Sequence, residues 1–397
     1  MNILFYQHQY PAFGGIETVT TLLARQFAAD GHAVAIVSIR SRAGTTLLDE
    51  LSPCVVVHQL PEDAYDSPSN REALRRILDA FSPDVVIFQD SYASIERTLF
   101  AALNDYRKGA VLKIIVEHNM PKVSVPCGEL TLSLGLVKFV RRFLGRMLYP
   151  IRYWRRSSSE RRRRRALYAA ADKYVFLSPR YIHVSNRIAG MDGGEKLTAL
   201  PNPIRPLTLE PNLSDKRKEI LYCGSLIPAK GVSRLIDIWA ELESSHIDWM
   251  FTIVGDGAER QNIENQVDRL GLKNVRFEGF RTDTEAYYHR ASILVMASSF
   301  EGWPMVLGEA MQQGCVPIAY DSFAALFDIV EDGKSGRIIK YKDSAAFSDA
   351  LNELMSNADK LARLQRGAIE KTKEYDLATI ARCWYALFNE NHKRGIE

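Results

Sequence analysis

The 397-residue chain lacks the features that mark several protein classes. It has no run of about 20 apolar residues, so we expect no membrane-spanning helix. Its N-terminus, MNILFYQHQYP, has no basic region and only a short apolar run, so we expect no signal peptide. The five cysteines are scattered without a Cys-x-x-Cys pair, which argues for a reducing cytosol and against a disulfide or zinc framework.

Several ligand-binding motifs are also absent from the sequence. The G-x-x-x-x-G-K-[ST] pattern of phosphate-binding loops does not occur, nor does the G-x-G-x-x-G pattern of dinucleotide sites. We find no D-x-D triplet and no His/Asp cluster with metal-ligand spacing, so we expect no bound metal.

The composition is that of an ordinary globular protein, with 46% apolar and 25% charged residues. A chain of this length is too long for one core, which favours two domains of roughly 200 residues each.

Short apolar runs alternate with segments of helical spacing along most of the chain. In the first half the predicted strands are NILFYQ, AVAIVSI, DVVIFQ and KIIVEH, and in the second half EILYCGS, WMFTIVGDG, NVRFEGF, SILVMASS and CVPIAY. Helices are predicted between them, for example over Asn70–Phe81 and near Ile95–Asn104. This alternation predicts two α/β domains with doubly wound parallel sheets.

We place the N-terminal Rossmann-like domain at residues 1–200 and the C-terminal one at 201–376, after the proline-rich stretch LTALPNPIRPLTLEPN. The strand ends of both domains are expected to face a shared interdomain cleft. A final helix within 377–397 either packs back on the N-terminal domain or is a simple amphipathic terminus.

Positive charge is concentrated in one segment of an insert that spans residues 120–165. Residues 138–165 contain twelve Lys or Arg and one acid, a formal charge of +11, whereas the whole chain carries +3. Aromatic and aliphatic residues alternate with the arginines, which favours binding to an anionic membrane surface. The alternatives are a solvated charge run and nucleic-acid binding, which no accompanying motif supports.

Two glutamates flank a predicted helix start in the stretch SSFEGWPMVLGEAM. Glu301 lies in the loop after a strand, and Pro304 suits the first helical turn. The helix N-terminus suits phosphate. Glu309, about one and a half turns inside, is placed to accept ribose hydroxyls, although a solvated helix residue would follow the same pattern.

Three other loops lie where a predicted strand ends. YCGSLIPAKG carries Lys230, which can neutralise a diphosphate as a point charge. In AFGGIE, Gly14 and Gly15 allow close approach to the backbone. In IIVEHN, His118 is a candidate for sugar contact or proton transfer, or a structural histidine.

Together these motifs resemble the retaining glycosyltransferases of family 4, which have the two-domain GT-B fold. The Glu-x7-Glu spacing continued by EAMQQGCVPIA carries the resemblance, with GSLIPAKGVSRLI, FGGIE and PNPI in support. The likeness spans nearly the whole chain. It implies transfer of a sugar from a UDP- or GDP-sugar donor, with no further cofactor and no metal.

The resemblance also implies roles for individual residues. Lys230 would stabilise the leaving diphosphate, Glu301 would contact the donor sugar, and His118 would face that sugar from the other domain. Glu309 would hold the ribose, and Phe280 with Arg281 would hold the base. The remaining expected donor-site residues are Gly14, Gly15, Gly224, Ser225, Gly302, Pro304, Met305 and Val306.

Ser225 stands where the family usually has arginine. Either Lys230 suffices, or an arginine such as Arg281 substitutes, or activity is weakened.

From the resemblance and the basic segment, the expected function is transfer onto a lipid-linked or cell-surface glycan, in polysaccharide or lipopolysaccharide synthesis at the inner face of the plasma membrane. The alternatives are a non-catalytic nucleotide-sugar or glycan-binding protein and a GT-B nucleotide-sugar epimerase.

Overall fold

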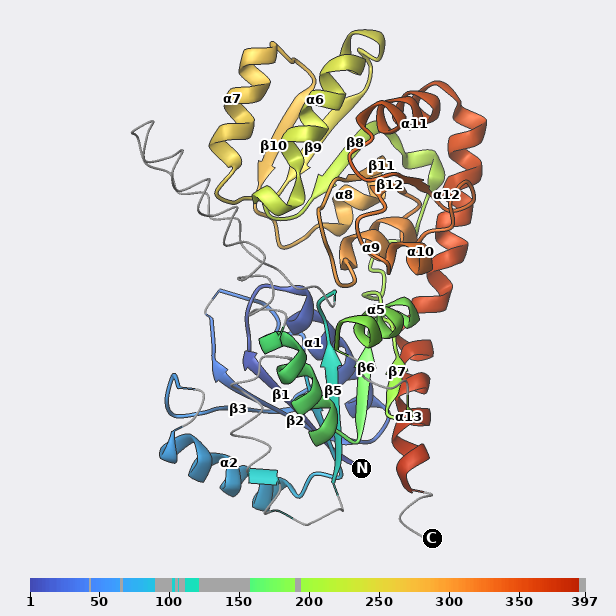
Figure 1. Cartoon of the computed structure of the whole chain (residues 1–397). Coiled ribbons are helices and arrows are strands. Elements are labelled where there is room, and N and C mark those ends of the chain that lie inside the picture. The colour runs from blue at the N-terminus through green and yellow to red at the C-terminus, as the bar shows by residue number, and fades with distance from the viewer. Residues whose placement is uncertain are drawn as a thin grey trace. The chain divides into compact units, whose positions relative to one another are not determined.

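The computed structural model describes residues 1–42, 44–64, 67–89, 102–103, 106, 111–120, 158–189 and 194–392 (Figure 1). The helix predicted near Ile95–Asn104 lies outside these ranges except for residues 102–103. Residues 121–157 of the predicted insert lie wholly outside them. The chain divides into two compact units, Met1–Phe13 with Ala28–Ala199, and Gly14–Phe27 with Leu200–Glu397.

The first unit is built on a seven-stranded parallel sheet. Its strands are β1 (Asn2–Gln9), β2 (Ala33–Arg40), β3 (Val56–Gln59), β4 (Val85–Phe88), β5 (Leu112–Glu117), β6 (Lys173–Phe176) and β7 (Leu197–Ala199). They lie in the order β3-β2-β1-β4-β5-β6-β7. Every residue of β4 and β6 is buried, as expected for central strands covered on both faces.

Helices of the first unit follow local sequence signals. The described elements are α2 (Pro68–Phe81), α5 (Pro179–Ala189) and a helical stretch over 158–170. The α2 helix begins where the Ser67 side chain accepts a hydrogen bond from the backbone N–H of Asn70, with Pro68 in the first turn. It ends at Ser82 in the left-handed conformation.

The second unit contains a six-stranded parallel sheet. Its strands are β8 (Arg217–Cys223), β9 (Met250–Val254), β10 (Val275–Gly279), β11 (Ala291–Met296), β12 (Val316–Tyr320) and β13 (Arg337–Ile339), in the order β10-β9-β8-β11-β12-β13. Its α-helices are α6 (Val232–Leu242), α7 (Arg260–Leu270), α8 (Glu285–Arg290), α9 (Met305–Gln312), α10 (Leu326–Ile329), α11 (Ser344–Ser356), α12 (Ala358–Thr372) and α13 (Leu377–His392).

Helix α1 (Gly15–Ala29) lies for the most part in the second unit by its contacts. The ring of Phe27 is 5.4 Å from that of Tyr385 and 5.8 Å from that of Phe388, both on α13. The core of the second unit is apolar, and Trp239 and Phe251 meet edge to face with ring centroids 6.3 Å apart.

In both sheets the strand order reverses beside the first strand, between β1 and β4 and between β8 and β11. The predicted pair of doubly wound parallel sheets is therefore confirmed, whereas the interdomain cleft stays a prediction. Ligands of such sheets bind outside the carboxyl ends of the strands at this reversal.

In the part of the chain that the structure describes, no helix has the length and apolar character needed to cross a bilayer.

Candidate active site

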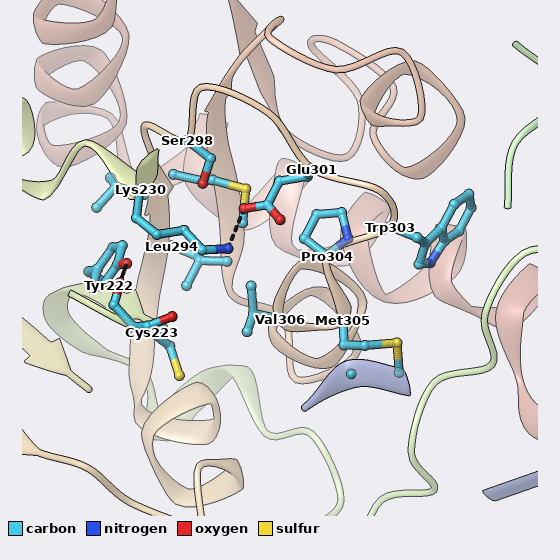
Figure 2. A pocket seen from close by; sticks show the side chains of 15 residues that line it. Tyr222, Cys223, Lys230, Leu294, Ser298, Glu301, Trp303, Pro304, Met305 and Val306 are labelled. Carbon is cyan, nitrogen blue, oxygen red and sulfur yellow. Dashed lines mark hydrogen bonds and ion pairs between the residues drawn. The ribbon is translucent and has the colours of Figure 1, made fainter. Parts of the chain in front are cut away.

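A cavity of about 240 Å³ opens at the carboxyl ends of β8 and β11, where the strand order of the second sheet reverses (Figure 2). It is lined by Gly15, Tyr222, Cys223, Gly224, Ser225, Lys230, Leu294, Val295, Met296, Ser298, Glu301, Trp303, Pro304, Met305 and Val306. Two strand ends and the start of α9 thus enclose one space. Eight of the predicted site residues are among those that line it.

Lys230 and Glu301 form an ion pair inside this cavity. Lys230 Nζ lies 2.5 Å from Glu301 Oε1, and Figure 2 shows the two side chains pointing toward each other. Both side chains are largely buried, with 26% and 13% of their surface exposed. The pairing holds a cation and an anion at fixed positions, although the two residues are 71 positions apart in the sequence.

The loop that carries Lys230 is fixed by its backbone. Residues Pro228–Lys230 form a short 3-10 turn, which ends at Gly231 with φ +67°. A Cβ atom at Gly231 would lie 2.5 Å from the carbonyl oxygen of Ala297, so this position requires glycine. The backbone N–H of Ser299 donates to the carbonyl of Ala229 at 2.7 Å, which ties this loop to the loop that carries Glu301.

The first turn of α9 forms another wall of the cavity. Pro304 precedes the helix with extended dihedral angles, and Met305 and Val306 begin it. The N-terminus of a helix carries partial positive charge and attracts phosphate groups. The cavity therefore combines the ammonium group of Lys230 with a helix N-terminus, which suits a charged diphosphate.

Two glycines of the predicted site also line the cavity. A Cβ atom at Gly15 would lie 3.6 Å from Met305 Cγ, an ordinary contact distance. Gly224 has φ +152°, at the edge of the left-handed range, and its added Cβ would lie 3.2 Å from Tyr222 Oη. Gly14 and Gly302 are not among the lining residues.

Glu309 does not line the cavity either, but it is joined to the cavity wall through Tyr288. The Tyr288 hydroxyl donates to Glu309 Oε2 at 3.2 Å and lies 3.3 Å from Sγ of the wall residue Cys223. Burial raises the pKa of the Glu309 carboxyl, while Arg205 and the Tyr288 hydrogen bond act in the opposite direction.

The base-binding candidates lie at the carboxyl end of β10. Phe280 has 55% of its surface exposed, and Arg281 is also exposed. Arg281 Nη2 lies 3.5 Å from Glu278 Oε2, so its charge is partly balanced. Neither residue lines the 240 Å³ cavity.

His118 follows β5 in the first unit. Its Nε2 donates to Gln89 Oε1 at 2.6 Å, and burial lowers its pKa to about 3. The imidazole is therefore neutral at physiological pH. A neutral, buried ring suits hydrogen bonding to a sugar hydroxyl better than it suits proton transfer as a base.

Sequence reasoning missed several members of the site, most of them strand residues such as Leu294, Val295 and Met296. Ser298 is the most informative of them. It lines the cavity, and its buried hydroxyl has no hydrogen-bond partner among the residues that the structure describes. Its position two residues after the end of β11 is the signal that could have identified it.

No group of three or more His, Cys, Asp or Glu side chains within the described ranges is arranged to hold a metal ion. The candidate donor-binding charges that line the cavity are Lys230 and the N-terminus of α9.

Comparison with known proteins identifies relatives by sequence. The chain is 26% identical over 175 residues to the amylovoran biosynthesis glycosyltransferase AmsD of Erwinia amylovora, covering 44% of this chain and 49% of the relative. It is 27% identical over 177 residues to a Campylobacter jejuni α-1,4-N-acetyl-D-galactosaminyltransferase, covering 44% and 49%. The chain spans about half, or less, of the length of the curated relatives it matches.

A solved structure resembles nearly the whole chain in fold. HepE from Anabaena in complex with UDP superposes with a TM-score of 0.74 at 18% identity, covering 98% of this chain and all of HepE. The family models "Glycosyltransferase Family 4" and "Glycosyl transferases group 1" match residues 13–206 and 208–371. With both halves matched and the GT-B architecture in place, the chain belongs to the family 4, or group 1, glycosyltransferases.

Proposed function

We propose that this protein is a retaining, metal-independent glycosyltransferase. It moves a sugar from a nucleoside-diphosphate donor onto a lipid-linked or cell-surface glycan. The observation that carries the proposal is the cavity at the strand-order reversal, in which Lys230, Glu301 and the start of α9 converge. A cation and a helix N-terminus would face the diphosphate, and a carboxylate would face the sugar.

Cleavage of the donor develops negative charge on the diphosphate and positive charge on the sugar. Lys230 and the first turn of α9 would stabilise the negative charge, because they are already fixed where it forms. In the structure, Glu301 balances the Lys230 charge. When the diphosphate takes over that cation, the Glu301 carboxylate is released to accept hydroxyls of the transferred sugar.

Retention follows if the acceptor attacks from the face that the diphosphate leaves. The bond between the anomeric carbon and the phosphate oxygen breaks, and a bond to the acceptor oxygen forms on the same face. The acceptor proton passes to the departing phosphate oxygen. In support of this route, the carboxylate that lines the cavity, Glu301, is paired with Lys230 rather than poised as a nucleophile.

Relatives support the proposed donor and acceptor classes. HepE was solved with UDP and with UDP-glucose, which favours a UDP-sugar over a GDP-sugar here. The name of the Campylobacter jejuni relative includes an acceptor glycan attached to PP-undecaprenol, a lipid diphosphate. A lipid-linked acceptor would also suit the basic sequence of residues 138–165, which would hold the enzyme at the inner face of the plasma membrane.

The test is thermal stabilisation by UDP, GDP, ADP and their common sugars, compared between the wild type and Glu309→Ala. We expect one nucleotide to raise the melting temperature by several degrees and the variant to lose most, but not all, of that shift. Anomeric configuration of the product and activity in EDTA then test retention and metal independence. No shift with any nucleotide would contradict the proposal. Binding without transfer or donor hydrolysis would favour a non-catalytic binding protein, with Ser225 as its explanation.

A further inference from the structure

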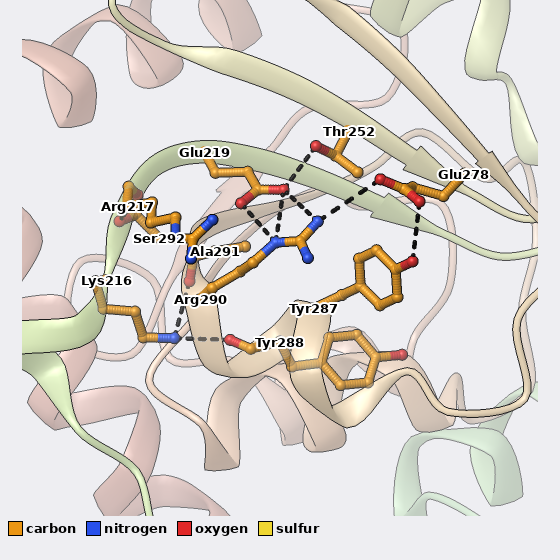
Figure 3. Close-up of polar contacts among 10 residues, drawn as sticks. All are labelled: Lys216, Arg217, Glu219, Thr252, Glu278, Tyr287, Tyr288, Arg290, Ala291 and Ser292. Atoms are coloured by element: carbon orange, nitrogen blue, oxygen red, sulfur yellow. Dashed lines mark hydrogen bonds and ion pairs between the residues drawn. The ribbon is translucent and has the colours of Figure 1, made fainter.

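The short helix α8 is held at its C-terminal end by a network of charges (Figure 3). Arg290 Nε lies 2.9 Å from Glu219 Oε2 on β8, and Thr252 on β9 donates to Glu219 Oε1 at 2.6 Å. Figure 3 shows Arg290 between Glu219 and Glu278, and its second contact, to Glu278 Oε1, is 3.9 Å. A short helix of six residues is thereby joined to two strands, β8 and β10.

Both ends of α8 are further tied by hydrogen bonds to its backbone and first side chain. Lys216 Nζ donates to the carbonyls of Tyr288 and Ala291 at 2.7 and 2.8 Å. Glu285 accepts from the backbone N–H groups of Thr208 at 2.8 Å and Leu209 at 3.0 Å. Since both ends of the helix are tied to neighbouring elements, the side chains that it presents have defined positions.

Tyr288 is the side chain of α8 that reaches the candidate site. It is 2% exposed, and its hydroxyl lies 3.2 Å from Glu309 Oε2 and 3.3 Å from Cys223 Sγ. Burial raises the pKa of Cys223 to about 12 and raises that of Tyr288 as well, so both groups are neutral at physiological pH. The hydroxyl has one hydrogen to give, and the carboxylate of Glu309 is the stronger acceptor.

The neighbouring Tyr287 is linked through Glu278 to Arg281, one of the base-binding candidates. Its hydroxyl donates to Glu278 Oε2 at 3.1 Å, and the Arg290 guanidinium stacks 4.4 Å from its ring centroid. The same Glu278 oxygen lies 3.5 Å from Arg281 Nη2. One helix therefore contacts both the ribose candidate Glu309 and Glu278, the residue that Arg281 also contacts.

We propose that α8 is the nucleoside-positioning element of the donor site, with Tyr288 orienting Glu309 toward the ribose hydroxyls and Tyr287 orienting the base-side turn through Glu278. This inference rests on the proposed function, because it takes Glu309 as the ribose ligand. It assigns the two tyrosines as positioning residues. It also predicts that the site selects ribonucleotides over 2′-deoxyribonucleotides.

The experiment is calorimetric titration of UDP, GDP, ADP and the 2′-deoxy form of each against the wild type, Tyr288→Phe and Tyr287→Phe. We expect the wild type to bind one ribonucleotide about tenfold more tightly than its 2′-deoxy form. Tyr288→Phe should bring that ratio close to one. Tyr287→Phe should keep the ribose ratio and reduce the preference for one base over the others. Each variant thus serves as the matched control for the other.

A double variant separates positioning from general loosening of the fold. If Tyr288 acts through Glu309, adding Tyr288→Phe to Glu309→Ala should leave the ribose ratio unchanged. The inference would be overturned if the wild type binds a nucleotide and Tyr288→Phe has the same ratio of ribonucleotide to 2′-deoxyribonucleotide affinity as the wild type. That outcome would leave the proposed function standing. A wild type that binds none of the six nucleotides would overturn both.

Discussion

The Arg164 guanidinium Nη1 lies 2.9 Å from Glu117 Oε2, and both side chains are almost completely buried, with 3% and 1% of their surface exposed. The Tyr174 hydroxyl donates to the same Glu117 oxygen at 2.6 Å. Arg164 belongs to the five-arginine run at the end of the basic segment. At least one arginine of that run is therefore internal, and it anchors the helical stretch over 158–170 to the end of β5 beside His118.

Replacing Arg164 with alanine should destabilise the protein strongly. The change leaves the Glu117 carboxylate buried with Tyr174 as a neutral partner, a situation that typically costs about 3–5 kcal/mol. Urea unfolding followed by circular dichroism measures the effect. Arg162→Ala, at an exposed position two residues earlier, should change stability by less than about 0.5 kcal/mol. Equal effects of the two substitutions would show that the buried pair contributes little.

The Lys230–Glu301 pair yields a prediction about turnover. Lys230→Ala should lower kcat by about 100- to 1000-fold at saturating donor, because a preorganised charge that faces the developing diphosphate is lost. The rate of donor consumption, measured by release of nucleoside diphosphate, tests this. Lys218→Ala is the control, since Lys218 lies near the amino end of β8, away from the cavity at its carboxyl end, and forms an exposed pair with Asp248. A kcat that is unchanged in Lys230→Ala would exclude the proposed role.

Much of the fold and part of the site could be predicted from the sequence because both depend on strand ends. In a parallel sheet the carboxyl ends of neighbouring strands share one edge. Lys230 and Glu301 follow β8 and β11, which are adjacent strands, so loops 71 residues apart meet at one cavity. The spacing of apolar runs was sufficient to place each residue after a strand, and the strand order brings the two loops together.

The contacts that the sequence could not predict are those made by side chains across elements. Nothing in the run of five arginines distinguishes Arg164, which pairs with a residue 47 positions away, from the exposed Arg161, Arg162 and Arg165. Tyr288 likewise reads as one aromatic residue in a short amphipathic helix. Its contact with Glu309 depends on how α8 packs beside α9, which local patterns do not encode.

We predict that the difference in stability between the wild type and Glu309→Gln depends on pH. Burial raises its pKa, so the folded state favours the protonated carboxyl more than the unfolded state does. This contribution is fully present below the ordinary carboxyl pKa and is lost as the pH rises through the raised value. Glu309→Gln, which does not titrate, should therefore be more stable than the wild type at pH 8, with a smaller difference at pH 4. Melting temperatures at both pH values test this, and a pH-independent difference would contradict it.

We predict that an arginine in place of Ser225 tightens the binding of UDP. It is exposed and lines the cavity, so an arginine at this position has room to extend toward the diphosphate. Ser225→Arg should tighten UDP binding by about 3- to 10-fold at low salt, because it adds a cation that can form bidentate hydrogen bonds to phosphate. The gain should shrink at 0.5 M salt. Calorimetry that shows weaker binding would mean that this part of the cavity holds something other than phosphate.

The basic segment predicts salt-dependent binding to anionic membranes. Flotation with phosphatidylglycerol vesicles should recover the protein, and phosphatidylcholine vesicles should not. Since each basic residue near such a surface contributes about 1 kcal/mol, replacing Arg155 and Arg156 with glutamine should weaken binding by roughly tenfold or more. The matched control replaces Arg75 and Arg76, exposed on α2, and makes the same change in net charge. If both pairs reduce binding equally, net charge alone is responsible, and preferential retention on RNA or DNA would instead favour a nucleic-acid partner.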